Sequence, residues 1–318
     1  MRATRFAAII LVVLATAAAG QGYPSRPVRM LVGFPPGGGT DIMARLLAPK
    51  LSEYLGQQFV VENRPGATTN IATDLVAKAS PDGHTLLFTT SAIAINMSLY
   101  KNLPFDALRD FAPISVFAES PNLLVAHPGA GASVAELLSQ ARAKPGSLNY
   151  SSAGAGTTQH LAGEVFKLRS GTQIVHIPYK GTAASLTAVI AGEVQFSFAN
   201  VPAILSHVKS GRLRALAVTA SRRSDLMPGV PTMQEAGVEG VEVPVWYALL
   251  APAATPPGVV SVLAGATARA ARSPDTRQRL VDQGADPVGN TPEEFAKLLR
   301  AEVAKYAEVV RISGAKAE

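Results

Sequence analysis

Residues 28–56 read VRMLVGFPPGGGTDIMARLLAPKLSEYLG. The apolar run Val28–Val32 predicts a buried strand, and the glycine-rich segment after it predicts a loop. Apolar residues then recur at helical spacing from Ile42 to Leu55, and Gly56 stands where a helix would end. A strand, a tight loop and a helix in this order form the building unit of a parallel sheet flanked by helices. The stretch therefore indicates an α/β fold.

The same alternation continues along the chain and then restarts. Strands are predicted at 59–61 and 85–88 with a helix at 71–78 between them, and after residue 120 the alternation begins again with a strand at 148–150. Each half predicts one mostly parallel sheet flanked by helices. The expected fold class is therefore α/β with two lobes.

Two apolar stretches, 113–126 and 241–250, interrupt the alternation and lack helical periodicity. We interpret them as crossovers between the lobes. The tail after residue 256 is helical throughout and is expected to complete the first lobe. The predicted organisation is lobe 1 from 21–123 plus 247–318, and lobe 2 from 124–246.

Residues 1–20 differ from the rest and are interpreted as a secretory signal peptide. Arg2 and Arg5 supply a short positive region, the residues after them are apolar, and small alanines precede the expected cut between Ala19 and Tyr23. A transmembrane anchor is the weaker interpretation, because a span needs about 20 apolar residues. The mature protein is therefore expected in the periplasm.

Composition and motifs exclude several classes of protein. The chain has 318 residues, of which 47% are hydrophobic and 16% charged, and this excludes a disordered chain. Its formal charge of +6 falls to 6 − 2 = +4 without the two signal-peptide arginines, and the basic residues are scattered, so nucleic acid is not an expected partner. Cysteine is absent, and the closest histidines, His160 and His176, are 16 residues apart, so neither a metal site nor a cofactor is expected. No hydrolase nucleophile motif occurs, and no catalytic residue is expected.

Three loops that follow predicted strands are candidates for binding an anion. The first, 36–41, is rich in glycine, which lets the backbone approach a ligand, and the free N–H groups of the following helix attract negative charge. The loops at 151–158 and 89–91 add serine and threonine hydroxyls. For the first loop alone, a plain glycine turn with Thr40 or Asp41 as the helix cap is the alternative. Because loops at the ends of parallel strands in two lobes can face one cleft, the sequence predicts a solute site between the lobes.

A series of short motifs runs along the mature chain. In order they are PGGGTD at 36–41, ENRPGA at 62–67, PDGHTL at 81–86, DFAP at 110–113, YSSAGAG at 150–156, PYKG at 178–181, GEV at 192–194, LRALAV at 213–218, PT at 231–232, EAG at 235–237 and WYALLAP at 246–252. Each is short, but the joint order is specific. It resembles the substrate-binding proteins of tripartite tricarboxylate transporters, the Bug family.

This resemblance implies a type II periplasmic-binding-protein fold. It also implies a small organic carboxylate as ligand, delivered to the membrane permease subunits of a transporter. Ligands in this family are held by backbone amides, hydroxyls and ordered waters. By motif match, the resemblance assigns ligand contact to Gly38, Gly39, Thr40, Thr90, Ser91, Ser152, Gly154, Thr157 and His160. For His160, helix capping or packing is the alternative.

Several positions leave the ligand and the function open. The family usually has a glycine pair where this chain has Thr68 and Thr69, and commonly Asp before the residue equivalent to Asn200, so the ligand is expected to differ from those of better-known members. Tyr179 and Lys180 belong either to a surface turn ahead of a helix or to a pocket wall, and Trp246 either packs under a hinge or touches the ligand. The competing functions are a secreted enzyme acting on a small acid or ester, and a sensor partner that presents its ligand to a membrane receptor.

Overall fold

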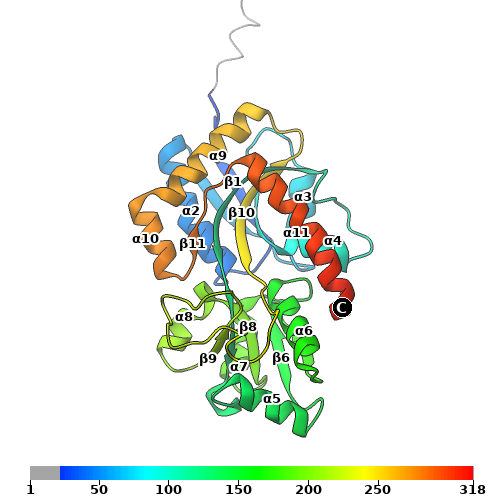
Figure 1. Ribbon diagram of the computed structural model, residues 1–318. Coiled ribbons are helices and arrows are strands. Elements are labelled where there is room, and N and C mark those ends of the chain that lie inside the picture. Colours follow the sequence, from blue (N-terminus) through cyan, green and yellow to red (C-terminus); the bar gives the residue numbers. More distant parts are fainter. Residues whose placement is uncertain (1–21, 318) are drawn as a thin grey trace, which may run out of the picture.

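The computed structural model describes residues 22–317, which form two lobes, one above the other in Figure 1. The signal peptide expected at 1–20 lies outside the described residues. Lobe 1 holds a six-stranded sheet and lobe 2 a five-stranded sheet, and helices flank both. Among residues 22–317, no helix has the length and apolarity needed to cross a bilayer.

Lobe 1 is built from two separate parts of the chain. The first part contains β1 (Val28–Val32), α2 (Gly39–Leu55), β2 (Phe59–Asn63), α3 (Asn70–Ala77), β3 (Thr85–Thr90), α4 (Ala92–Leu99) and β4 (Phe111–Ser120). The second part contains β10 (Val245–Pro252), α9 (Pro257–Arg272), α10 (Pro274–Asp282), β11 (Asp286–Pro287) and α11 (Pro292–Ser313).

Lobe 2 lies between these parts in sequence. It contains β5 (Asn122–Ala126), the short 3₁₀ helix η2 (Pro128–Ala130), α5 (Val134–Ala143), β6 (Asn149–Ser152), α6 (Thr158–Ser170), β7 (Val175–Pro178), α7 (Thr182–Ile190), β8 (Phe196–Asn200), α8 (Val201–Lys209) and β9 (Arg214–Val218).

Each sheet combines three parallel strands with antiparallel neighbours. The order in lobe 1 is β11-β4-β10-β3-β1-β2, in which β1 is parallel to β2 and β3, and β10 is antiparallel to β3 and β4. The order in lobe 2 is β7-β6-β8-β5-β9, in which β6 is parallel to β7 and β8, and β5 is antiparallel to β8 and β9. The sheets are thus mixed where mostly parallel sheets were expected. Parallel pairing needs a helical connection, whereas the strands beside the lobe crossings enter their sheets directly.

The opening unit of the chain forms as its sequence predicts. Val28–Val32 forms β1 with only Arg29 exposed, and the helix that follows lays Met43, Leu47 and Leu51 against the sheet. Because the chain leaves β1 at its carboxyl end, the glycine loop is carried to the edge of the sheet that faces lobe 2.

The chain passes between the lobes twice. β4 ends and β5 begins on either side of Pro121, just before the boundary expected after residue 123. The chain returns through 219–244, and the second expected boundary falls at the start of β10. The side-chain amide of Asn122 donates a hydrogen bond to the Val243 carbonyl at 2.8 Å, and this bond ties the two crossings together.

The last helix, α11, contacts both lobes. It packs along α4 and β4 of lobe 1 and also touches α6 of lobe 2 (Figure 1). Thr291 and Glu294 form the capping box expected at its start. On its inner face Phe295, Leu299 and Tyr306 are buried. The C-terminal helix therefore packs on the sheet and a helix of lobe 1 and adds a contact between the lobes.

Two helical glycines give a matched test of core packing. A Cβ at Gly163 in α6 would lie 2.1 Å from Cε2 of the fully buried Tyr150 ring, whereas a Cβ at Gly265 in α9 meets nothing within 4 Å. Gly163→Ala is expected to lower the free energy of unfolding by about 1–3 kcal/mol through overpacking. Gly265→Ala is expected to raise it by about 1 kcal/mol through helix propensity. Urea unfolding of both variants measures the change in the free energy of unfolding. A change of the same sign in both variants would contradict the packing of α6 on Tyr150.

Candidate functional site

A buried carboxylate fixes the loop between β1 and α2. Asp41 is 4% exposed and accepts hydrogen bonds from the Gly37 backbone N–H at 3.1 Å, from Arg45 Nε at 3.0 Å and from Asn63 Nδ2 at 3.0 Å. Burial opposes ionisation of Asp41, but these hydrogen bonds outweigh it and hold the pKa of the carboxyl below its usual value. Asp41 therefore supports the loop, and its oxygens are occupied.

A small cavity, which we call the inner cavity, lies between the lobes. Its volume is about 20 Å³, which is room for about one water molecule. Both lobes contribute to its lining, which consists of Phe34, Gly38, Thr40, Thr90, Ala153, Thr157, Thr158, Gln159, Thr182, Asn200 and Val245.

Five helices begin at the inner cavity, and this determines its electrostatics. The lining residue at or beside each helix start is Gly38 for α2, Thr90 for α4, Thr157 for α6, Thr182 for α7 and Asn200 for α8. The first N–H groups of a helix lack partners within it, and the helix dipole adds partial positive charge there. No charged side chain lines this cavity. The arrangement suits an anion held by neutral donors.

Two buried polar atoms beside the inner cavity lack a hydrogen-bond partner among residues 22–317, Asn200 Oδ1 and Tyr247 OH. Both approach Gly39, where a Cβ would lie 2.1 Å from Asn200 Oδ1 and 3.0 Å from Tyr247 OH. Burial raises the pKa of the Tyr247 hydroxyl, which stays a neutral donor. Buried polar groups are normally paired. These two atoms are therefore candidates to contact a solute, and Gly39 is the position where the lobes approach each other.

A larger cavity, which we call the outer chamber, opens from the same cleft. Its volume is about 580 Å³, within the range of small-molecule sites. The lining consists of Gly33, Phe34, Pro35, Pro65, Gly66, Ala67, Thr68, Tyr100, Gly154, Ala155, Pro178, Tyr179, Lys180 and Gly181. Phe34 lines both cavities, so the two are neighbours, and Lys180 is the only charged residue in either lining.

One wall of the outer chamber has an unusual backbone. Residues 67–69 have φ angles of +44°, +46° and +76°, although none is glycine. Asn96 Nδ2 holds this loop by donating to the Thr68 carbonyl at 2.9 Å. The Tyr100 hydroxyl lies 3.4 Å from Thr68 Oγ1 and, across the cleft, 3.4 Å from the Ala155 carbonyl. The loop thus keeps a backbone shape that glycines favour, and Thr68 adds a side chain to the wall.

The structure brings most of the site residues predicted from the sequence to the cleft. Four of them line the inner cavity, namely Gly38, Thr40, Thr90 and Thr157. Gly154, with a φ of +128°, lines the outer chamber, and a Cβ there would lie 3.0 Å from Thr68 Oγ1 of the other lobe. The two glycine loops therefore face each other across the lobes.

Two predicted serines line neither cavity. Ser91 and Ser152 are fully buried. Ser91 Oγ accepts a hydrogen bond from the Trp246 backbone N–H at 3.2 Å, and Ser152 Oγ lies 2.7 Å from His176 Nε2. Their hydroxyls therefore hold the loops in place.

The predicted His160 lies behind its loop in lobe 2. Its Nδ1 accepts a hydrogen bond from the Gly156 backbone N–H at 3.2 Å, and its ring stacks on His176 with centroids 4.3 Å apart. Burial lowers the pKa of His160 to about 4 and that of His176 to about 3, so both are neutral at neutral pH. Within residues 22–317, no group of three or more His, Cys, Asp or Glu side chains could hold a metal ion.

Residues that the sequence did not single out complete the inner cavity. Gln159 Oε1 accepts from the Ala153 N–H at 2.8 Å, and its Nε2 donates to Thr182 Oγ1 at 3.0 Å, so it links two of the loops. Thr182 and Asn200 are polar residues directly at helix starts, which is the signal that marked the other loops. Tyr247 lies inside an apolar run, and no local pattern distinguishes it.

The two aromatic residues left open by the sequence lie in different surroundings. Trp246 is 3% exposed, packs edge-on against Phe295 of α11 with centroids 5.4 Å apart, and lines neither cavity. Tyr179 lines the outer chamber.

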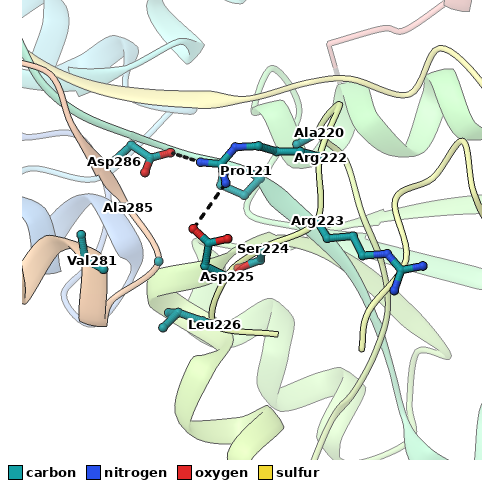
Figure 2. A pocket seen from close by; sticks show the side chains of 11 residues that line it. Pro121, Ala220, Arg222, Arg223, Ser224, Asp225, Leu226, Val281, Ala285 and Asp286 are labelled. Atoms are coloured by element: carbon teal, nitrogen blue, oxygen red, sulfur yellow. Dashed lines mark hydrogen bonds and ion pairs between the residues drawn. The ribbon is translucent and has the colours of Figure 1, made fainter. Parts of the chain in front are cut away.

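A third pocket, of about 100 Å³, lies on the hinge side of the molecule (Figure 2). Figure 2 shows Arg222 of lobe 2 between two carboxylates, Asp225 at 3.4 Å and Asp286 of lobe 1 at 3.7 Å. Arg223, which points away from them, pairs with Glu235 at 2.8 Å. Because each arginine already faces a carboxylate, this pocket is a poorer place for an anionic solute than the interlobe cleft.

Comparison with known proteins gives consistent matches. The family model described as the tripartite tricarboxylate transporter family receptor matches residues 43–314. The protein BugT of Bordetella pertussis is 39% identical, over 99% of each chain. Among solved structures, R. palustris Rpa4515 with adipate is 38% identical with a TM-score of 0.90, covering 93% of this chain and 100% of that one. MatC from Rhodopseudomonas palustris with bound malate is 31% identical with a TM-score of 0.86, covering 91% and 100%.

Proposed function

Because this chain belongs to the tripartite tricarboxylate transporter family of receptors, which are solute-binding proteins and not enzymes, we propose that it captures a small organic carboxylate between its lobes. The observation that carries the proposal is the meeting of five helix starts at an uncharged inner cavity. Partial positive charge without a counter-ion favours an anion over a neutral solute.

The carboxylate is assigned to the inner cavity and the body of the solute to the outer chamber. The proposed contacts are the N–H groups and hydroxyls of Gly38, Gly39, Thr40, Thr90 and Thr157, with Gly154 facing the solute from lobe 2. Ser91, Ser152 and His160 support these loops from behind. Because the inner cavity has room for about one water molecule, the lobes have to separate before a solute enters, by the hinge bending usual in such two-lobed proteins.

The relatives support the class of ligand. Rpa4515 was solved with adipate and MatC with malate, both dicarboxylates. We further propose that the chain works in the periplasm after removal of its signal peptide, and that it delivers the solute to the permease subunits of the transporter for which the family is named.

The free acid is expected to bind at least tenfold more tightly than its ester, which corresponds to about 1.4 kcal/mol. A carboxylate accepts charge-assisted hydrogen bonds from the inner cavity, and an ester loses that charge and adds a group the cavity has no space for. Calorimetric titration with adipate, malate and their dimethyl esters measures this. Mass spectrometry of the recovered solute gives the control, since a binding protein returns it unchanged. Equal affinity for acid and ester would exclude an anion site.

A further inference from the structure

We propose that the outer chamber selects dicarboxylates with an apolar spacer, and that Lys180 is the residue that recognises the distal carboxylate. This inference rests on the proposed function, because it takes the first carboxylate to lie in the inner cavity. It adds a class of solute and a specificity-determining residue.

The apolar character of the outer chamber follows from its walls. Three aromatic side chains from three segments, Phe34, Tyr100 and Tyr179, line it together with three prolines. The polar group of Tyr100 already lies between Thr68 Oγ1 and the Ala155 carbonyl. A hydroxylated carbon chain would therefore lose its water and find few partners, and unpaired buried hydroxyls are costly. Methylene groups gain from the same surface.

Lys180 is the charged residue in the lining of the outer chamber. It lies in the loop from β7 to α7, of which Tyr179, Lys180 and Gly181 line the outer chamber while Thr182 lines the inner cavity. One short loop thus connects the two cavities. Lys180 is exposed, no ion pair joins it to another described residue, and neither cavity lining contains a carboxylate that would neutralise it. A solute that extends from the inner cavity therefore enters a chamber to whose lining this lysine belongs.

A matched set of three six-carbon acids tests both parts of the inference. Adipate and galactarate have the same chain and charge, but galactarate carries four hydroxyls; hexanoate lacks the second carboxylate. By calorimetry, adipate is expected to bind at least tenfold more tightly than galactarate. Lys180→Met is expected to weaken adipate by about two- to fivefold, the range of an exposed ion pair, and to leave hexanoate unchanged. Lys209→Met, at an exposed lysine on α8 outside both cavities, is the control and should leave all three unchanged.

The outcomes separate this inference from the proposed function. Galactarate binding as tightly as adipate would overturn the apolar selection, and an equal loss for adipate and hexanoate in Lys180→Met would overturn the role of the lysine. In both cases carboxylate binding itself stands. If none of the three acids and no malate bound the wild-type protein, the proposed function would fail, and this inference with it.

Discussion

Gly39→Val is expected to weaken binding of the carboxylate by about ten- to a hundredfold, which corresponds to about 1.4–2.8 kcal/mol. The first atom of any side chain at this position would lie 2.1 Å from Asn200 Oδ1 of lobe 2 and 3.0 Å from Tyr247 OH. A valine side chain is therefore expected to hold the two lobes apart. Rotation of Asn200 relieves part of the overlap, but the branched side chain then fills space that the solute needs. Overpacking of this kind costs about 1–3 kcal/mol.

Calorimetry and small-angle scattering with adipate measure the effect together. The wild-type protein is expected to show a smaller radius of gyration with bound solute, and Gly39→Val is expected to stay extended. Gly265→Val, on α9 outside both cavities, is the matched control, because a Cβ there meets nothing within 4 Å. Thermal unfolding close to that of the wild type verifies the fold of each variant. Wild-type affinity and compaction in Gly39→Val would show that the lobes do not close at this glycine.

The free energy of unfolding is expected to fall steeply as the pH drops from about 6.5 towards 4. The pKa of His160 is lowered to about 4 and that of His176 to about 3 in the folded protein, against 6.5 when exposed. Below pH 6.5 the unfolded chain binds protons that the folded protein does not, so protonation favours unfolding. The contribution of the two neutral histidines to the free energy of unfolding is complete above about pH 6.5 and is lost as the pH falls below this value. Each histidine contributes a slope of up to about 1.4 kcal/mol per pH unit.

Replacing one histidine tests whether this pH dependence of the free energy of unfolding comes from His160 and His176. Carboxylates with lowered pKa values, such as Asp41, add to the acid sensitivity of every variant. In His176→Gln the side chain no longer titrates, so urea unfolding at pH 7, 5.5 and 4.5 should show a shallower slope by about 1.4 kcal/mol per pH unit. A slope in His176→Gln equal to that of the wild type would contradict a half-buried His176 that stays neutral in the folded protein.

Local patterns predicted the parts of this protein that local interactions form. β1 and α2 follow from an apolar run, a glycine loop and helical spacing, all within residues 28–56. The helix starts were predictable for the same reason, since a polar cap and the first free N–H groups belong to adjacent residues. The loops that contain Thr40 and Thr157 were predicted through this signal, whereas ligand contact was assigned to these two residues by the family resemblance.

The remaining features depend on partners far away in sequence. Tyr247 reaches the site only because β10 pairs with β3 and brings residue 247 beside the glycine loop. The directions of the Ser91 and Ser152 hydroxyls are set by Trp246 and His176, which no spacing could reveal. Helix α4 escaped prediction because six of its eight residues are buried, which leaves no amphipathic period to detect.

The hydrogen bond between Asn122 and Val243 lies where both connecting chains pass between the lobes. It joins the two connecting chains, so we expect the lobes to rotate about an axis that passes close to it. Asn122 lies opposite Asn200 in the β5–β8 ladder, and the lining of the inner cavity includes Asn200 and Val245. The inner cavity therefore lies beside this hydrogen bond. The outer chamber takes no residue from either crossing. Rotation of the lobes is therefore expected to displace the walls at the mouth, such as Tyr179, further than the groups that hold the carboxylate.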